Sequence, residues 1–225
     1  MLADTKMWLQ FLPSLLLLLT AAAQAASFCP EKDVISPCEC TRDYENASVS
    51  VYCSGSHMSA AEMTAIVGRL QNTTMSRLQI IGFADLTEIP AGMFSDLEIF
   101  SLTIRSSSRP TMNAQSFAGI RGLIELILTS LGMTEQPSVI FPSVSHVEFL
   151  DLSYNRFTTL PERIFSPFRQ LLRLFLQFGS LTTIAPNALG GLSTLEYLDL
   201  SHNKSGFIKP GLFAEMGQLY TMMLK

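Results

Sequence analysis

The feature that most constrains this chain is a period of 24 residues that runs from Met75 to the carboxyl end. The two clearest copies read VEFLDLSYN, from Val147, and LEYLDLSHN, from Leu195. The other segments with the same spacing begin at Met75, Ile99, Leu123, Leu171 and Leu219. Six repeats are therefore complete and a seventh is truncated. A fixed period of this length indicates a solenoid, in which each repeat packs against its neighbours.

Each repeat carries two apolar sets. In the copy that begins at Leu195, Leu198 and Leu200 alternate with Tyr197 and Asp199, which is typical of a short strand with one buried face. A second set closes the back of the coil, and in the fourth copy it consists of Leu160, Phe165 and Phe168. One repeat cannot bury both sets alone, so successive strands are expected to pair in parallel. The predicted fold class is an α/β solenoid: a right-handed coil with a concave parallel β-sheet and an irregular or short-helical convex side.

Four cysteines lie ahead of the repeats, at positions 29, 38, 40 and 53. An even number in a secreted chain indicates two disulfides, for which three connectivities are open. The C-x2-4-C spacing of a zinc site is absent. We expect Cys38 and Cys40 to point to opposite sides of a strand and to reach different partners. This expectation favours the pairs Cys29–Cys40 and Cys38–Cys53.

The repeat motif and the cysteine cluster together carry a family resemblance. The pattern L-x-x-L-x-L-x-x-N-x-L resembles that of extracellular leucine-rich repeat proteins, and the chain is similar to the cysteine-capped type found in Slit, Toll ectodomains, chaoptin-like adhesion proteins and small proteoglycans. The resemblance covers roughly residues 29–225. It implies the fold, whereas the partners of those proteins depend on outward-facing residues that the motif leaves free.

The asparagine position of the motif tests how regular the coil is. In chain order it holds Phe83, Ser107, Leu131, Asn155, Gly179 and Asn203. Phe83 also reflects a one-residue shift, because the apolar residues that follow it run one place late. We therefore expect the first three repeats to be less regular than the rest, with turns satisfied by other groups or by water.

The amino-terminal 25 residues predict a secretory signal peptide. An apolar run is followed by Ala23 and Ala25 at the spacing of a cleavage site. A membrane anchor is the alternative, but Gln10, Pro13 and Gln24 interrupt the roughly 20 apolar residues that a span needs. No second long apolar run follows, so we expect no membrane span in the mature chain and an extracellular location.

The sequence divides into three parts: a signal peptide at 1–25, a cysteine-rich cap at 26–74 and repeats at 75–225. Within the cap, Ser59 and Glu62 form a capping box that predicts a short amphipathic helix over 60–71. Glycosylation sequons occur at Asn46, Asn72 and Asn203. We expect glycans at Asn46 and Asn72, and a buried structural role for Asn203.

The chain does not carry the residues of an enzyme. The three histidines, His57, His146 and His202, occupy unlike positions in the repeats and are not expected to converge on a nucleophile or a metal. Asp151 and Asp199 lie two repeats apart, which is too far for a retaining glycosidase pair. We expect no catalytic residues, no metal and no cofactor. A formal net charge of -4 also argues against binding of nucleic acid.

What remains is a candidate binding patch on the outward positions of the fourth to sixth repeats. It consists of Phe149, Asp151, Arg173, Phe175, Tyr197 and Asp199. Aromatic residues and arginine are enriched at interface hot spots. The alternative is that these residues shelter one another, with Arg173 stacked on a ring and paired with a flanking aspartate.

Two functions fit these features. The first is a secreted or cell-surface recognition module that binds an extracellular protein, or less readily a glycan, on the concave sheet. The second is a structural or accessory subunit of an extracellular matrix or secreted complex. Leu219, Met222 and Leu224 would lie at an open end of the core. Because repeat proteins need covered ends, we expect this end to be continued by further chain or covered by a partner.

Overall fold

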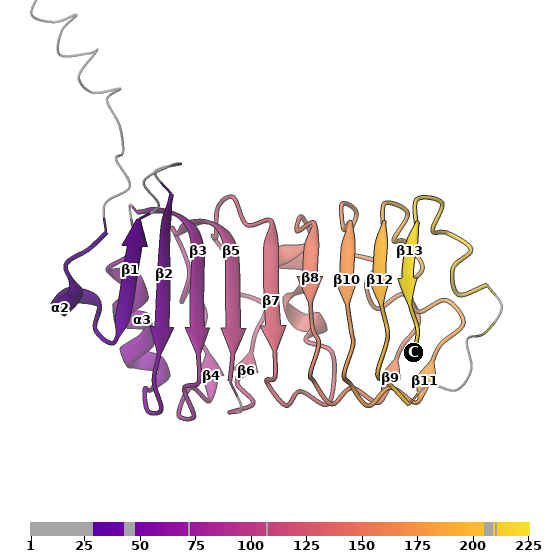
Figure 1. Ribbon diagram of the computed structural model, residues 1–225, viewed down its shortest axis with the longest axis horizontal. Coiled ribbons are helices and arrows are strands. Elements are labelled where there is room, and N and C mark those ends of the chain that lie inside the picture. Colours follow the sequence, from indigo (N-terminus) through magenta and orange to yellow (C-terminus); the bar gives the residue numbers. More distant parts are fainter. Residues whose placement is uncertain (1–28, 43–47, 72, 107, 205–208, 210) are drawn as a thin grey trace, which may run out of the picture.

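One sheet of nine strands runs along the long axis of the molecule (Figure 1). The computed structural model describes residues 29–42, 48–71, 73–106, 108–204, 209 and 211–225. In this part of the chain the sheet strands, in spatial order, are β1 (Cys38–Arg42), β2 (Val49–Ser54), β3 (Thr74–Ile81), β5 (Glu98–Arg105), β7 (Glu125–Thr129), β8 (Phe149–Asp151), β10 (Arg173–Phe175), β12 (Tyr197–Asp199) and β13 (Thr221–Met223). β1 and β2 are antiparallel, and each later pair of neighbours is parallel. The expected signal peptide, residues 1–25, lies outside the described residues.

The parallel pairs from β3 to β13 keep the register that the period predicts. Arg77 lies opposite Ser101, and Arg173 lies opposite Tyr197, each 24 residues further along the chain. The inward-facing leucines therefore stack in a fully buried row: Leu78, Leu102, Leu126, Leu150, Leu174 and Leu198. Burial of one leucine contributes roughly 1.5–3 kcal/mol. Since each leucine packs between neighbouring repeats, this row holds the repeats together.

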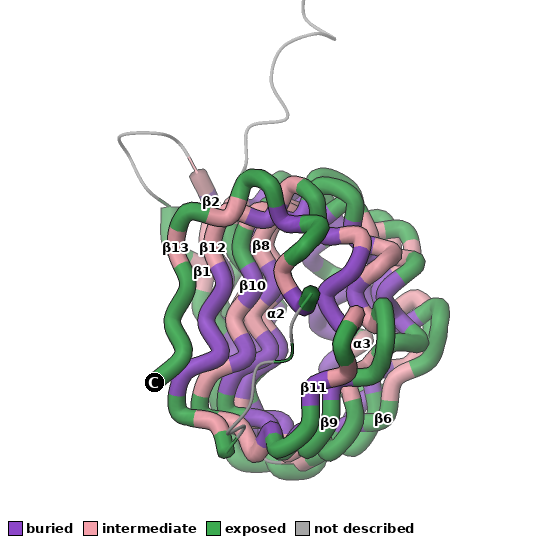
Figure 2. Tube along the Cα trace, turned by 90° about the vertical axis from the view of Figure 1, so that its right-hand side faces the viewer, coloured by how far each residue is buried: buried purple, intermediate pink, exposed green. Residues whose placement is uncertain are grey.

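Short strands, and little helix, form the side of the coil opposite the sheet. β4 (Glu88–Ile89) pairs with β6 (Thr111–Met112), and β9 (Thr159–Leu160) pairs with β11 (Thr183–Ile184). A 3-10 helix, η1 (Ser138–Val144), and the cap helices α2 (Lys32–Ile35) and α3 (Ala60–Gly68) complete the described elements. Figure 2, which looks along the coil, shows buried segments both on the sheet and on this opposite side. The fold is thus a parallel β-solenoid of leucine-rich repeats.

Stacked phenylalanines fill the core behind the sheet. The Phe94 and Phe117 rings are 5.6 Å apart, and the Phe141 ring is 4.9 Å from that of Phe168 and 5.7 Å from that of Phe165. All five side chains are buried. Rings in such offset and edge arrangements add about 0.5–1.5 kcal/mol per pair beyond their buried area. The phenylalanine-rich second half of the repeat therefore performs the packing role that the sequence predicts.

The first repeats differ from the later ones in both halves. The one-residue shift after Phe83 is confirmed, because Glu88 pairs with Thr111, one residue short of the 24-residue spacing of the sheet. The sheet itself is not less regular there: β3 and β5 each have 8 residues, whereas β8, β10 and β12 each have 3. In β8 and β12 the strand ends at an aspartate whose Oδ1 accepts the N–H of the serine two residues later. β3 and β5 do not end at such an aspartate–serine bond, and these strands are longer.

Two disulfides close the cap, with the connectivity favoured above. Cys29 is bonded to Cys40, and Cys38 is bonded to Cys53. The expected reason is wrong, however, because residues two apart on a strand share a face. Register selects the partners instead: Cys38 lies opposite Cys53 in the β1–β2 pair, at a Cα–Cα distance of 4.0 Å, and Cys40 lies opposite Val51. Cys40 is thereby left for Cys29, ahead of the sheet.

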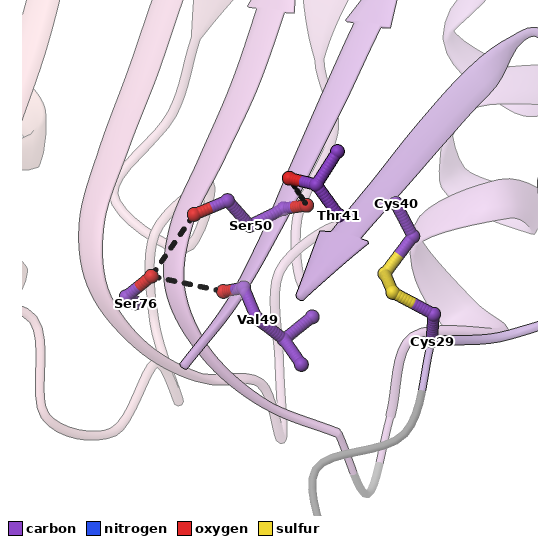
Figure 3. The surroundings of a disulfide bond; sticks show 6 residues. All are labelled: Cys29, Cys40, Thr41, Val49, Ser50 and Ser76. Atoms are coloured by element: carbon purple, nitrogen blue, oxygen red, sulfur yellow. Dashed lines mark hydrogen bonds between the residues drawn. A yellow bond between two sulfur atoms is a disulfide. The ribbon is translucent and has the colours of Figure 1, made fainter. Parts of the chain in front are cut away.

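Side-chain hydrogen bonds connect β1, β2 and β3 beside the Cys29–Cys40 bridge (Figure 3). The hydroxyl of Thr41 donates to the Ser50 carbonyl at 3.4 Å, and the hydroxyls of Ser50 and Ser76 lie 3.0 Å apart. The Ser76 hydroxyl also donates to the Val49 carbonyl at 3.0 Å. The antiparallel hairpin of the cap is thus joined to the first parallel strand.

The capping helix α3 begins where the sequence predicts and ends earlier. Ser59 Oγ accepts the N–H of Glu62, and the Glu62 carboxylate accepts the N–H of Ser59, which completes the capping box. The helix ends at Gly68, not at residue 71. The N–H groups of Arg69 and Leu70 then bond to carbonyls three residues earlier. This tighter turn places Leu70 fully in the core.

Candidate functional site

The six residues of the candidate patch lie together on the outer face of β8, β10 and β12, the face away from the core. Two rows across the strands contain them. Phe149, Arg173 and Tyr197 are in register in the first row, and Asp151, Phe175 and Asp199 are in register in the second. The structure therefore brings all six predicted residues together, and below we call this group the aromatic–acid patch.

The three rings of the patch contact one another diagonally across the strands. The Phe175 ring lies 5.0 Å from that of Phe149 and 5.0 Å from that of Tyr197, with interplanar angles of 33° and 31°. All three side chains are half-buried. They form one continuous aromatic surface that remains partly open to solvent. Apolar surface of this kind, away from the core, is typical of an interaction site.

The two aspartates of the patch are held by local hydrogen bonds. Asp151 Oδ1 accepts the N–H of Ser153 at 2.8 Å, and Asp199 Oδ1 accepts both the N–H and the hydroxyl of Ser201, at 2.8 and 2.6 Å. Asp199 is only 6% exposed. Burial raises the pKa of Asp151, and the charge of Asp199 raises this pKa further, while the bonds from Ser153 oppose the rise. The ionised form of Asp151 is therefore less favourable in the patch than it is in water.

Arg173 has no ionic partner in the patch. Its side chain is exposed, and the ion pairs of the described residues join Lys32 to Glu39, His57 to Asp85 and Arg163 to Glu215. The ion pair between Arg173 and a flanking aspartate, which the alternative interpretation of the patch included, is therefore not formed. The two rows explain this, because Arg173 has rings on both sides in its own row, while the aspartates flank Phe175.

Two hollows adjoin the patch. One, of about 190 Å³, is lined by Phe100, Ile124, Glu125, Glu148, Phe149, Leu172 and Arg173. The other, of about 600 Å³, is lined by Tyr197, Asp199, Ser201, His202, Met222, Met223, Leu224 and Lys225. Phe100, which is 48% exposed, was not predicted to belong to this surface. Phe100 lies ahead of the outward strand positions of its repeat, so the alternation that defined the patch did not include it.

A second aromatic row, also missed from the sequence, lies just beyond the carboxyl ends of the same strands. The Phe178 ring stacks on Tyr154 at 4.6 Å and on His202 at 4.1 Å, with nearly parallel planes. All three residues have positive φ angles, between 51° and 58°. The Tyr154 and Phe178 N–H groups bond to carbonyls of the following repeat, which holds the strained backbone in place. The 24-residue spacing of the three rings was the signal that could have found them.

Potential metal ligands do not cluster in the part of the chain that the structure describes. No group of three or more histidine, cysteine, aspartate or glutamate residues in this part of the chain could hold a metal ion. His57 contacts Asp85 at 2.8 Å on the exposed cap, whereas His202 lies in the aromatic row at the other end. Among the described helices, none is long and apolar enough to span a membrane.

Of the three sequons, Asn203 lies in the described part of the chain. Asn46 and Asn72 lie outside the described residues, so their glycosylation stays a prediction. Asn203 is half-buried, and its Nδ2 donates to the carbonyls of Leu176, Leu200 and Ser201. Since a glycan would attach at this nitrogen, these bonds support the expectation of a structural role for Asn203.

Comparisons with known proteins agree with this architecture. Two family models, both described as leucine-rich repeat, match residues 169–225 and residues 146–168. A comparison with curated protein sequences finds no match. Among solved structures, this chain is similar to that of the TLR13–ssRNA13 complex, with 27% sequence identity and a TM-score of 0.62. The match covers 75% of this chain and 23% of that chain.

Two further solved structures show a similar likeness. The match to the Drosophila Toll–Spatzle complex has 20% sequence identity and a TM-score of 0.63, and it covers 76% of this chain and 22% of that chain. The match to human 5T4, also called trophoblast glycoprotein, has 19% sequence identity and a TM-score of 0.63, and it covers 88% of this chain and 81% of that chain. This chain thus spans less than a quarter of the TLR13 and Toll chains that it matches. With the repeats in register and both bridges in place, it is a leucine-rich repeat protein with a disulfide-bonded amino-terminal cap.

Proposed function

We propose that this protein is an extracellular recognition module that binds a protein partner through the aromatic–acid patch. The observation that carries the proposal is the continuous surface of three half-exposed rings beside an exposed arginine that has no ionic partner. Such a surface offers apolar area and a free guanidinium to a partner at little conformational cost. A row of rigid strands fixes these side chains in place.

The disulfide-bonded cap and the predicted signal peptide support an extracellular location, because disulfides persist in oxidising compartments. The related Toll structure is a complex with Spatzle, which supports a protein as the ligand class. TLR13 was solved with ssRNA13. The acidic residues of the patch do not suit a phosphate backbone, which needs a basic surface.

The proposal is tested by selection from a displayed library of secreted proteins against the mature chain. The selected binders are then measured on the double variant Arg173→Ala, Phe175→Ser, for which we expect at least about tenfold weaker binding. The matched control is Arg77→Ala, Ile81→Ser, which alters the same face of the sheet in the first repeat. Binders that lose no affinity on the patch variant would reject the patch as the recognition surface.

The alternative function, a structural subunit, predicts a different behaviour of the purified chain. An obligate subunit aggregates without its partner, whereas a recognition module remains a monomer. Sedimentation of the mature chain over a range of concentrations separates the two, and monomers that bind selected proteins through the patch support the proposal.

A further inference from the structure

The outer face from β7 to β12 is acidic. Glu125, Asp151 and Asp199 occupy outward positions, and Glu148 lines the smaller hollow beside them. Arg173 is the one cation at the strand positions of this part of the described face. At its borders, Glu196 accepts a bond from the Tyr220 hydroxyl, and Lys225 lines the larger hollow without forming an ion pair. Charge complementarity therefore favours a basic partner surface.

The patch aspartates retain an unused oxygen. Each Oδ1 is bonded to a serine, but Oδ2 of Asp151 and of Asp199 has no hydrogen-bond or ion-pair partner among the described residues. Asp199 is only 6% exposed, and its carboxylate has no cationic partner among the described residues, although Arg173 lies on the adjacent strand. Acidic side chains are rarely buried this deeply without a partner.

Phe175 lies between the two carboxylates. Asp151 is opposite it on one side and Asp199 on the other. With roughly 4.8 Å between neighbouring strands, each aspartate is one strand away from Phe175. A ring face attracts a cation within about 6 Å of its centroid. The three residues thus form a cradle with an aromatic floor and an acidic wall on each side.

Resting on the proposed function, we infer that the protein partner inserts an arginine or lysine side chain into this cradle, above Phe175 and between Asp151 and Asp199. The alkyl stem of such a side chain packs on the neighbouring rings, and its charged head supplies the missing cation. The occupant is thus a basic residue of an extracellular protein.

The charge state of Asp151 makes this contact sensitive to acid. Burial raises the pKa of Asp151, and the charge of Asp199 adds to the effect. As the pH falls, Asp151 therefore takes up a proton before an ordinary aspartate does, and the attraction for a cation is lost. A bound cation favours the ionised form, so binding near this pKa releases protons.

A displayed library of random peptides tests the inference. We expect peptides selected on the mature chain to be enriched in arginine and lysine, and to bind about tenfold more weakly to the double variant Asp151→Asn, Asp199→Asn. Asparagine keeps the Oδ1 acceptor for Ser153 and Ser201, so the strand ends remain supported. The control Asp33→Asn, Asp96→Asn removes the same charge from exposed positions outside the sheet, and binding to it should be unchanged.

The possible outcomes separate the two proposals. Peptides that depend on Arg173 and Phe175 but show no enrichment in basic residues would overturn the cradle and leave the proposed function standing. Peptides that bind the Arg173→Ala, Phe175→Ser variant as well as they bind the unaltered chain would overturn both. Equal weakening on the control pair would show a general charge effect and would also overturn the cradle.

Discussion

At the scale of single residues, Asn155 provides hydrogen bonds that the backbone alone does not make at the turn after β8. Its Oδ1 accepts the N–H groups of Leu131 and Met133, and its Nδ2 donates to the carbonyls of Leu128 and Leu152. Asn155 is 3% exposed, so water cannot replace these bonds freely. One side chain therefore satisfies backbone groups of two repeats.

Where the asparagine position holds another residue, serine hydroxyls take over part of this role. Ser106 Oγ donates to the Phe83 carbonyl at 2.6 Å, and Ser108 Oγ donates to the Leu86 carbonyl at 2.7 Å. The expectation that other groups satisfy these turns is thus confirmed for the second repeat. That Ser106 and Ser108 take part could not be predicted, because the residues at 106–108 are all serine.

Replacing Asn155 by alanine should destabilise the protein by about 2–4 kcal/mol, because buried N–H groups and carbonyls are left without partners. Ser101→Ala is the matched control, since the Ser101 hydroxyl is also buried but has no hydrogen-bond partner among the described residues. We expect its effect to be within about 0.5 kcal/mol. Chemical unfolding measures both. Equal losses of stability in the two variants would contradict the role of the asparagine.

The patch shows how far residue-level prediction reaches. Strict alternation along a strand correctly placed Phe149, Phe175 and Tyr197 on the outer face. The diagonal ring contacts and the depth of Asp199 could not be predicted, because they depend on side-chain rotamers and on the neighbouring strands. For the same reason the sequence could not decide whether Arg173 pairs with an aspartate, as the alternative interpretation of the patch required.

At the scale of elements, long strands and the capping helix were predictable, and short convex strands were not. β3 and β5 carry an alternation that is long enough to recognise, and α3 begins with a capping box. β4, β6, β9 and β11 have 2 residues each, which is too short for a period to be visible. They exist because neighbouring repeats place identical turns side by side, which is a property of stacking.

The capping box of α3 is testable. Ser59→Ala removes the acceptor for the Glu62 N–H and should lower stability by about 1 kcal/mol at neutral pH. The bond from the Ser59 N–H, and then that from the Ser59 hydroxyl, lowers the pKa of Glu62. The lowered pKa stabilises the fold above the ordinary pKa of 4.5, and this contribution is lost as the pH falls through the lowered value.

Unfolding measured from neutral to acidic pH should therefore show a smaller loss of stability in the Ser59→Ala variant than in the unaltered chain. Ser56→Ala is the control, because it replaces a serine just ahead of the helix that does not occupy the cap position. An unchanged pH dependence in Ser59→Ala would show that the Glu62 carboxylate does not couple to folding through this cap.

At the scale of the whole molecule, the strand order dictates how stability is distributed. In the nine-stranded sheet, each strand from β2 to β12 pairs only with its two neighbours in the sheet. The cap closes one end of this series through the β1–β2 hairpin and its bridges. In such a linear array, the loss of stability that a local defect causes passes through neighbouring interfaces and becomes smaller with distance from the defect.

Removal of the Cys38–Cys53 bridge with the double variant Cys38→Ser, Cys53→Ser should therefore destabilise the protein unevenly. The bridge is buried and cross-links two sheet strands, so its loss should cost about 2–4 kcal/mol. Amide hydrogen exchange should show the largest loss of protection in β2 and β3 and little change in β10 and β12. Cys29→Ser, Cys40→Ser is the control, and its smaller effect should be confined to the segment before β1, because that bridge leaves the strands of the sheet unlinked to one another. A uniform loss of protection from β3 to β12 would mean that the repeats unfold as one unit, and that the cap stabilises the distant aromatic–acid patch as strongly as it stabilises its own neighbours.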